Sequence, residues 1–429
     1  MGKIIGQDFL SIGIGFGPSN IALAIALKNV SDDGKASAKH IFFDKQDEFS
    51  WHPGLLFPES TMQISFLKDL VSMVDPKSEF TFLNFLHAKG RLHHFINLRT
   101  FYPRRTEFEE YLRWAAKKLE DYAQFQKSVV SVELETPETP EISSLIVEVI
   151  DKNGGQQFHR TKNLILADGG FPVWPKGVSP STRIVHGNST LDRLAVLALP
   201  DIPQTRFHIV GSGQSAADIL YYLMNNFKQA KVIITHKSFA MRPEDDSHFI
   251  NELFFPSGIE LFEQLSQHWR DKVIRDYWHV THNGVTIDML PKLYEAVYYD
   301  LVSGAGRFSF NRFSELVGAR EMDKGVVAEV KNLTTGKITD VRSDLLILAT
   351  GYQRPCPHPL LQNLQQYFQT TEDGQSYHLD RNYQIVTTRQ KLGFNVFMQG
   401  YGERTHGFSE ALLSLVPIRA ERIAKAIYE

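Results

Sequence analysis

The chain has 429 residues, 42% of them hydrophobic and 22% charged, which is enough to bury two or more cores and argues against a disordered chain. Its formal net charge of −3 gives no electrostatic reason to expect DNA, RNA or an anionic membrane as a partner. The single cysteine, Cys356, excludes an intrachain disulfide and the paired thiols of a dithiol-disulfide flavin reductase. We therefore expect a small-molecule partner and a reducing compartment.

An apolar stretch near the N-terminus, Phe9 to Leu27, has neither the basic segment nor the cleavage site of an export signal. Glycines, a proline and polar residues interrupt it. No window reaches the roughly 18 unbroken apolar residues of a membrane span. We expect a cytoplasmic protein that has no membrane partner.

The N-terminal segment predicts a strand, a glycine-rich turn and a helix, which together form a βα unit. The strand is Phe9 to Ile14 and the helix is Ile21 to Leu27. A polar connection with the run 31–35 leads to a second strand, His40 to Phe43, which ends in Asp44. This order is typical of a dinucleotide-binding half.

The next part of the chain predicts one helix and several strands. Arg105 to Leu119 has apolar residues on one helical face, Val129 to Val149 is rich in strand formers, and Leu164 to Ala167 is a short apolar strand. A proline-rich loop after it suits a crossover between domains.

A second strand–turn–helix–strand pattern follows the crossover. It comprises a strand at Phe207 to Val210, a helix at Ser215 to Met224 and a strand at Lys231 to Thr235. Pro243 to Tyr299 lacks the rhythm of a parallel sheet and is interpreted as an insertion. A strand at Leu345 to Leu348 and a C-terminal helix from about Ser409 to Tyr428 complete the chain.

The first glycine-rich turn carries Gly13, Gly15, Gly17 and Pro18 in the arrangement that lets a backbone approach a pyrophosphate at a helix N-terminus. Proline suits the first turn of a helix, where its missing N–H has no partner. Asp44 at the end of the next strand is placed to hold ribose hydroxyls. The alternative interpretation is a structural tight turn followed by a solvated acid.

The second turn, Gly211 to Ala216, lies between a predicted strand and a predicted helix and is the cleaner fingerprint. The strand after it ends in a cation, Lys237, where an acid would favour NADH, so the pattern favours the extra phosphate of NADPH. Arg242 is the reserve candidate. Either cation could instead be a solvated surface charge.

Two nucleotide folds, with Ala349-Thr350-Gly351 closing a late strand, indicate one flavin and one nicotinamide. We predict an α/β protein with two Rossmann-like dinucleotide-binding domains and a small substrate-binding region. The expected FAD-binding domain is 1–175 with 353–429. The expected NADPH-binding domain is 176–352, with a substrate-binding insertion at about 243–299.

Eight segments, in order from about Asp8 to Arg422, resemble those of the microbial N-hydroxylating flavin monooxygenases, the ornithine, lysine and diamine N-monooxygenases of siderophore biosynthesis. The segments are GIGFGPSNIALAIAL, FSWHPGLLFPES, MQISFLKDLVS, FYPRRTEFEEYLRWAA, GSGQSAADI, DDSHFINELFFP, LILATGY and THGFSEALLS. The resemblance implies that NADPH reduces FAD, that O₂ then forms a C4a-hydroperoxide, and that a neutral amine attacks its distal oxygen.

The resemblance also implies roles at the substrate. Lys68 matches a substrate-contacting lysine, Gln63 a glutamine near the flavin, and Asn251 the asparagine that holds the reacting amine. A free alkylammonium has a pKa of about 10.4, and desolvation or a nearby cation favours its neutral form. Without the resemblance, Lys68 is a surface lysine and Asn251 a turn residue.

The far end of the substrate is less defined. Ser409 matches a residue at the far end of the pocket in the ornithine enzymes, and its alternative role is a helix N-cap. The region equivalent to an Asn-Thr-Asn-Tyr-like stretch reads VTHNGVT here, closer to the lysine and diamine branch, while most other segments resemble the ornithine branch. We expect an ornithine-like substrate, with lysine, putrescine, cadaverine and histamine as alternatives, and substrate contacts from Thr281, His282 or Asn283.

Motifs and resemblance together predict a set of cofactor-binding residues and no metal site. The predicted residues are Gly13, Gly15, Gly17, Pro18, Ser19, Asp44, Lys45, Trp51, His52, Gln63, Arg105, Gly211, Gly213, Gln214, Ser215, Lys237, Thr350, Gly351, Tyr352, His406 and Gly407.

Two other functions compete with this one: a flavin monooxygenase acting on sulfides or ketones, and a nucleotide-binding sensor without turnover. The Lys68 and Asn251 motifs argue against the former, and amine-stimulated NADPH oxidation would exclude the latter. Because the family often forms dimers or tetramers, the resemblance implies a homo-oligomer of one of these sizes.

Overall fold

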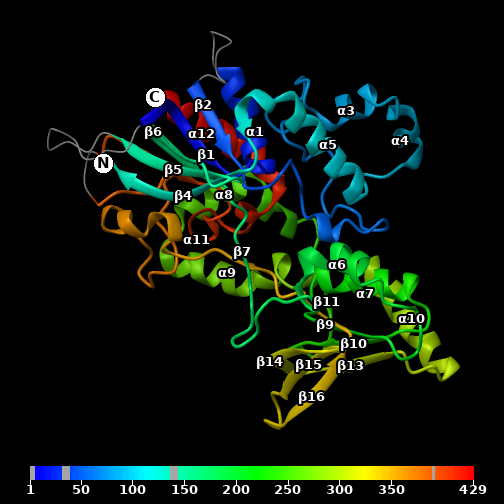
Figure 1. Ribbon diagram of the computed structural model, residues 1–429. Coiled ribbons are helices and arrows are strands. Elements are labelled where there is room, and N and C mark those ends of the chain that lie inside the picture. Colours follow the sequence, from blue (N-terminus) through cyan, green and yellow to red (C-terminus); the bar gives the residue numbers. More distant parts are fainter. Residues whose placement is uncertain (1–4, 31–38, 136–143, 389–391) are drawn as a thin grey trace.

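The computed structural model describes residues 5–30, 39–135, 144–388 and 392–429. The predicted polar run at 31–35 lies outside the described residues. The chain forms two units, each built on its own mainly parallel sheet (Figure 1). Within the described part of the chain, no helix has the length and apolar character needed to cross a bilayer.

The first unit contains a seven-stranded sheet with the order β3-β2-β1-β6-β5-β4, in which β19 also pairs with β6. Strands β2, β1, β6 and β19 are parallel, while β4 and β5 add an antiparallel edge. The strands are β1 (Ile5–Ile14), β2 (His40–Phe43), β3 (Ala123–Gln124), β4 (Lys127–Leu134), β5 (Leu145–Asp151), β6 (Gln156–Leu166) and β19 (Asn395–Met398). The C-terminal part of the chain therefore completes the N-terminal sheet.

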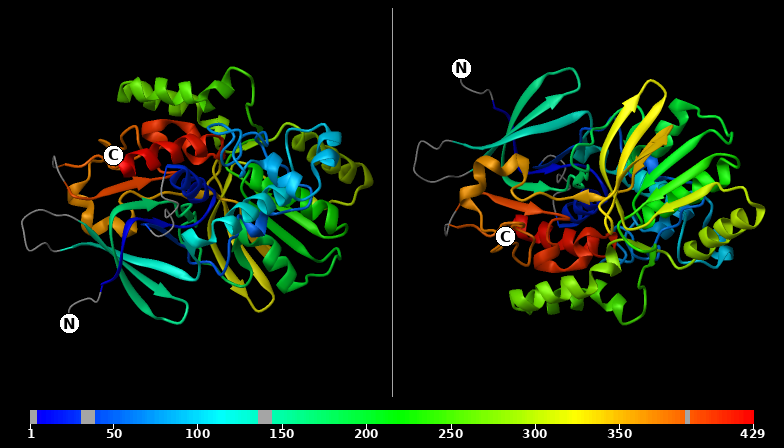
Figure 2. Two further views of the ribbon diagram at one scale, coloured as in Figure 1. Left: turned by 90° about the horizontal axis from the view of Figure 1, so that it is seen from above. Right: turned by 90° about the horizontal axis from the view of Figure 1, so that it is seen from below.

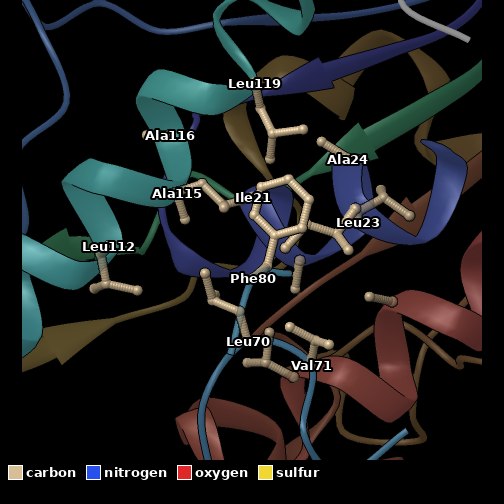
Figure 3. Close-up of a cluster of buried hydrophobic side chains, with 14 of the residues drawn as sticks. Ile21, Leu23, Ala24, Leu70, Val71, Phe80, Leu112, Ala115, Ala116 and Leu119 are labelled. Atoms are coloured by element: carbon tan, nitrogen blue, oxygen red, sulfur yellow. The ribbon is translucent and has the colours of Figure 1, made fainter. Parts of the chain in front are cut away.

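Helices α1 (Pro18–Val30), α5 (Arg105–Lys118) and α12 (Val416–Tyr428) pack into one apolar core on this sheet. Figure 3 shows side chains of α1 and α5 converging with Leu70, Val71 and Phe80 from the loop between them. The shorter helices α3 (Phe82–Ala88) and α4 (Leu92–Leu98) extend this layer.

The second unit has a five-stranded parallel sheet with the order β13-β10-β9-β17-β8. Helices α6, α7 and α10 pack on it, and an antiparallel sheet of β14, β15 and β16 lies beside it. The elements are β8 (Ile184–His186), α6 (Thr190–Leu197), β9 (Arg206–Val210), α7 (Gln214–Asn226), β10 (Lys231–Thr235), α10 (Met289–Ser303), β13 (Phe308–Asn311), β14 (Ser314–Met322), β15 (Gly325–Asn332), β16 (Ile338–Ser343) and β17 (Leu345–Leu348).

Two connections join the units and run side by side as β7 (Phe171–Pro172) and β18 (Tyr352–Gln353), an antiparallel pair. An excursion from the second unit returns to the first. It contains β11 (Arg242–Pro243), η4 (Ile250–Phe254), α8 (Pro256–Gln264), α9 (Gln267–Thr281) and β12 (Gly284–Val285). Helices α8 and α9 lie beside the C-terminal helices of the first unit (Figure 2), where Arg422 donates to Glu263 at 3.3 Å.

Most predicted elements of the two βα patterns are confirmed, with β2, β10 and β17 at the predicted bounds. The predicted C-terminal helix from Ser409 is wrong in its start. The segment forms η6 (Phe408–Ala411), η7 (Leu413–Leu415) and then α12. Leu412 is extended, and Pro417 in the first turn of α12 favours a new helix start there.

Candidate active site

The first glycine turn joins β1 to α1 at the carboxyl end of the first sheet. A Cβ on Gly13 would lie 2.1 Å from the Phe42 ring, and Gly15 has a φ of +82°, so both positions require glycine. A Cβ on Gly17 would have no atom within 4 Å. Pro18 begins α1. The turn thus leaves open space at a helix N-terminus, which fits a diphosphate group.

Asp44, the predicted ribose ligand, holds this turn. Its Oδ2 accepts a hydrogen bond from the Phe16 N–H at 2.7 Å, and its Oδ1 accepts one from the Gln46 N–H at 2.9 Å. Each oxygen keeps a second lone pair for a ribose hydroxyl. Lys45 beside it is exposed.

A buried ion pair that the sequence analysis missed lies behind the same turn. The side chains of Arg419 and Glu410 are 3% and 1% exposed, and their charged atoms lie 2.9 Å apart. Arg419 also donates to Ser19 Oγ at 3.0 Å and to Gln399 Oε1 at 3.2 Å, and Gln399 donates to Asn20 Oδ1 at 2.8 Å. The C-terminal segment therefore holds the first turn of α1. In the sequence, the signal that could have revealed this ion pair is an arginine on the apolar face of the last helix.

The second glycine turn joins β9 to α7. Gly211 has a φ of +140°, and a Cβ there would lie 2.4 Å from the Ala349 carbonyl oxygen. A Cβ on Gly213 would lie 3.2 Å from Asn283 Cα. Ser215 follows in the first turn of α7. The predicted nicotinamide turn thus contacts the segment predicted to bind substrate.

The two candidate cations that follow β10 differ in their surroundings. Lys237, which is 74% exposed, forms an ion pair with Glu315 at 3.2 Å. Arg242 is exposed and forms no ion pair with any residue that the structure describes.

Aromatic side chains gather where the two units meet. The rings of His52 and Tyr352 are 6.1 Å apart, and Trp51 lies 5.3 Å from His52. Burial raises the pKa of Tyr352 to about 12, and desolvation lowers the pKa of His52. Thr350 Oγ1 donates to the carbonyl that follows β7 in the first connection, at 2.6 Å. Gly351, which has a φ of +76°, lies between Thr350 and Tyr352.

Gln63 and Arg105 face the second unit. The Gln63 amide donates to the Glu244 carboxylate, and an Arg105 guanidinium nitrogen lies 2.9 Å from Asp218 Oδ2. Gln214 in the second glycine turn donates to Asp218 at 3.0 Å. Gln63 and Arg105 of the first unit therefore each contact an acid of the second unit, while the bond of Gln214 lies within α7.

Lys68 extends from a loop fixed by Asp69. The buried Asp69 carboxylate accepts N–H bonds from Val71, Ser72 and Phe82 at 3.0, 2.7 and 2.7 Å. The Lys68 ammonium makes no ion pair or hydrogen bond with any described residue, and desolvation lowers its pKa. The loop thus presents a half-buried cation that has no partner.

Asn251 lies on η4, which packs on the first unit through an apolar cluster. The cluster joins Phe254 to Val280 of α9 and Phe408 of η6. Asn251 Nδ2 donates to the Asp246 carbonyl at 2.7 Å, while its Oδ1 accepts no hydrogen bond from a described residue. The amide oxygen is therefore available to an N–H donor.

The segment after α9 carries His282, whose ring stacks on Trp278 with centroids 3.6 Å apart. Thr281 Oγ1 lies 2.8 Å from its Nδ1. Its Nε2 lies 3.6 Å from the carboxylate of Glu403, a residue that the sequence analysis missed. Burial raises the pKa of Glu403 to about 7 and lowers that of His282.

The segment from His406 to Ser409 is buried beneath these groups. Ser409 is 1% exposed, and its hydroxyl has no partner among the described residues. His406 stacks on Tyr383, and burial lowers its pKa to about 3. Gly407 has a φ of +83° and packs on the Phe262 ring. The structure thus places Asn251, His282 and Ser409 on elements that pack together.

No group of three or more histidines, cysteines or acids that could hold a metal occurs among residues 5–30, 39–135, 144–388 and 392–429.

The family model of the L-lysine 6-monooxygenase/L-ornithine 5-monooxygenase matches residues 7–354. The chain belongs to this family. Its members are FAD- and NADPH-dependent N-hydroxylating monooxygenases, so this chain is a flavin-dependent monooxygenase with FAD and NADPH as its cofactors.

Three known proteins show how far the similarity extends. The L-ornithine N(5)-monooxygenase of Pseudomonas aeruginosa is 33% identical over 97% of this chain and 93% of its own. The ornithine N-hydroxylase of Kutzneria sp. 744, a structure with reduced FAD, NADP⁺ and L-ornithine, has a TM-score of 0.90 at 30% identity, covering 98% and 99% of the two chains. The FAD-bound cadaverine monooxygenase of Erwinia amylovora has a TM-score of 0.83 at 25% identity, covering 98% and 95%.

Proposed function

We propose that this enzyme N-hydroxylates the terminal primary amine of ornithine, for hydroxamate siderophore biosynthesis. The ornithine enzymes above, similar over nearly the whole chain, support this substrate. The observation that carries the proposal is the unpartnered ammonium of Lys68, in a segment that resembles the substrate-contacting loop of the family.

Lys68 has two tasks in this proposal. It contacts the substrate, and its positive charge lowers the pKa of the substrate ammonium, because a nearby like charge favours the neutral form. Since Asp69 fixes the loop through three backbone N–H bonds, the backbone that carries Lys68 is already ordered before the substrate binds.

Asn251 and Ser409 complete the proposed substrate contacts. The free Oδ1 of Asn251 accepts an N–H from the reacting amine and orients its lone pair. The buried, unpartnered hydroxyl of Ser409 bonds the far end of the substrate, with Thr281, His282 and Asn283 nearby. Gln63, at the junction of the two units, contributes near the flavin.

We propose that the first unit, 1–175 with 353–429, binds FAD and that 176–352 binds NADPH, with the insertion at 243–299 binding substrate. The open space at Gly17 and the fixed turn at Gly211 support this division. Bound FAD and NADPH supply the electrons that activate O₂. The protein contributes the two glycine turns, the half-buried cation and the exclusion of water between the units.

The test is hydroxylamine formation by FAD-loaded protein with NADPH and O₂, measured in parallel on ornithine, lysine, putrescine, cadaverine and histamine. Product with ornithine alone is the expected result. The VTHNGVT segment and the similar cadaverine enzyme favour a decarboxylated amine as the second candidate. Product only from such an amine would replace ornithine and make that segment the specificity determinant.

A cytoplasmic location and assembly into a dimer or tetramer belong to the same proposal. The single cysteine and the use of NADPH support the cytoplasm. Fractionation and sedimentation velocity test these two points.

A further inference from the structure

A buried line of polar contacts crosses between the two units. Arg105, at the start of α5, is fixed to the first unit because its backbone N–H donates to the Ser60 carbonyl at 2.9 Å and its Nε to the Thr61 carbonyl at 3.2 Å. Its guanidinium lies 2.9 Å from Asp218 Oδ2 on α7 of the second unit. The two side chains are 15% and 1% exposed.

The line continues to the excursion that carries the proposed substrate residues. Gln214 Nε2 donates to Asp218 Oδ1 at 3.0 Å, and Gln214 Oε1 accepts the Thr286 N–H at 2.8 Å. Both ends of the Gln214 amide are therefore oriented, and Thr286 directly follows β12. Arg105, Asp218, Gln214 and Thr286 thus connect the first unit, the second glycine turn and the excursion.

Packing alone does not require an acid at this place. The neighbours of Asp218 on α7, Ala216, Ala217, Ile219 and Leu220, are all buried apolar residues. A buried carboxylate is costly unless it is paired, and apolar replacements of a buried pair are often neutral or stabilising. The opposite charges of Asp218 and Arg105, paired across the two units, are what the acid adds rather than stability.

We propose that Asp218 is a positioning residue that, through Arg105, holds the second unit against the first so that nicotinamide and flavin meet in the geometry of hydride transfer. This rests on the proposed cofactor division. A misplacement of about 1 Å can slow a reaction about a hundredfold, so a pair that sets the relative position of two units controls the rate more than the affinity.

The test measures the rate of anaerobic flavin reduction by NADPH, monitored as the loss of flavin absorbance. It compares the FAD-loaded wild type with Asp218→Asn, Asp218→Glu and Glu135→Gln. Asp218→Asn keeps the shape but removes the charge opposite Arg105. We expect reduction at saturating NADPH to slow at least about tenfold, with the dissociation constants of FAD and NADPH changed less than about threefold. Asp218→Glu restores the carboxylate and is expected to recover most of the rate.

Glu135→Gln is the matched control, because Glu135 pairs with Arg160 at the antiparallel edge of the first sheet, away from the junction. Its reduction rate is expected to equal that of wild type. Small-angle X-ray scattering of the FAD-free proteins supplies a readout without turnover, with a larger radius of gyration expected for Asp218→Asn alone.

An unchanged reduction rate in Asp218→Asn, or a lower melting temperature without a slower rate, would overturn the proposal. If Asp218→Asn does not fold, Arg105→Gln is measured in the same way, and a wild-type rate there has the same meaning. Failure of wild type to be reduced by NADPH would instead contradict the proposed function.

Discussion

The side-chain amide of Gln63 donates a hydrogen bond to the Glu244 carboxylate, across a sequence separation of 181 residues. Glu244 is in turn fixed to the excursion, because its backbone N–H donates to the Val285 carbonyl at 2.9 Å. Burial raises the pKa of Glu244, and the bond from Gln63 opposes that rise. A residue predicted near the flavin is thus a structural link to the substrate segment.

Gln63→Ala is expected to raise the fraction of NADPH oxidation that ends in peroxide by about threefold or more, because the excursion loses a contact that holds it to the first unit. Loss of the amide also leaves the Glu244 pKa higher than in wild type. Peroxide and hydroxylamine assays check this. Gln157→Ala, in an exposed glutamine of β6, is the control. Equal coupling in both variants would contradict the prediction.

Lys68→Ala is expected to raise the KM for the amine about tenfold or more and to uncouple NADPH oxidation, since the cation that contacts the substrate and favours its neutral form is lost. Steady-state kinetics across amine concentrations measure both effects. Lys77→Ala removes an exposed lysine from the same region and is expected to change neither. If Lys68→Ala couples NADPH oxidation to hydroxylamine formation as well as the wild type does, Lys68 is not part of the substrate site.

Two glycines of the first turn are expected to respond differently to alanine. Gly13→Ala forces a Cβ against the buried Phe42 ring and is expected to destabilise the FAD-free protein by about 1–3 kcal/mol. Gly17→Ala meets no protein atom and is expected to leave that stability unchanged while weakening FAD binding. Thermal unfolding and FAD titration separate the two effects. If Gly17→Ala binds FAD as tightly as the wild type, the proposed binding of FAD at this turn is wrong.

Lys237→Ala is expected to raise the KM for NADPH about tenfold while leaving that for NADH unchanged, if Lys237 binds the 2′-phosphate. Glu315 competes for this lysine, so Glu315→Gln is expected to lower the KM for NADPH. Arg242→Ala is the comparison. If only Arg242→Ala raises the KM for NADPH, Arg242 and not Lys237 contacts the 2′-phosphate.

Acid is expected to destabilise the second unit through His208. This side chain is fully buried, with Nε2 2.8 Å from Thr235 Oγ1, and burial lowers its pKa to about 4. Because the folded-state pKa lies below the unfolded value of 6.5, the contribution is complete above pH 6.5 and is lost as the pH falls towards 4. The loss amounts to about 3 kcal/mol.

Urea unfolding at pH 7.5, 6 and 5 measures this dependence. His208→Gln is expected to make it less steep over that range, whatever its effect on stability at pH 7.5, because one buried histidine no longer titrates. An equally steep loss in the variant would assign the acid sensitivity to other groups, such as the buried His40 and His406.

The sequence alone determined the two βα patterns and both glycine turns, because these are local signals. The roles of Lys68 and Asn251 stay predictions that come from the family resemblance. Strand, turn and helix at Gly13 and at Gly211 follow from apolar runs and glycine spacing within about twenty residues. Family resemblance added function to residues that composition would leave as surface polar groups.

Only the tertiary structure decided which distant groups meet. Pairing of β19 with β6, the hydrogen bond from Arg419 to Ser19 and the contact of Arg105 with Asp218 join residues far apart in the chain. The start of α12 at Val416, with Pro417 in its first turn, was likewise not revealed by a helical pattern from Ser409. Hydrophobic periodicity records which face of an element is buried, but not which partner covers it, because burial is non-directional whereas ion pairs and hydrogen bonds depend on where the folded chain brings each atom.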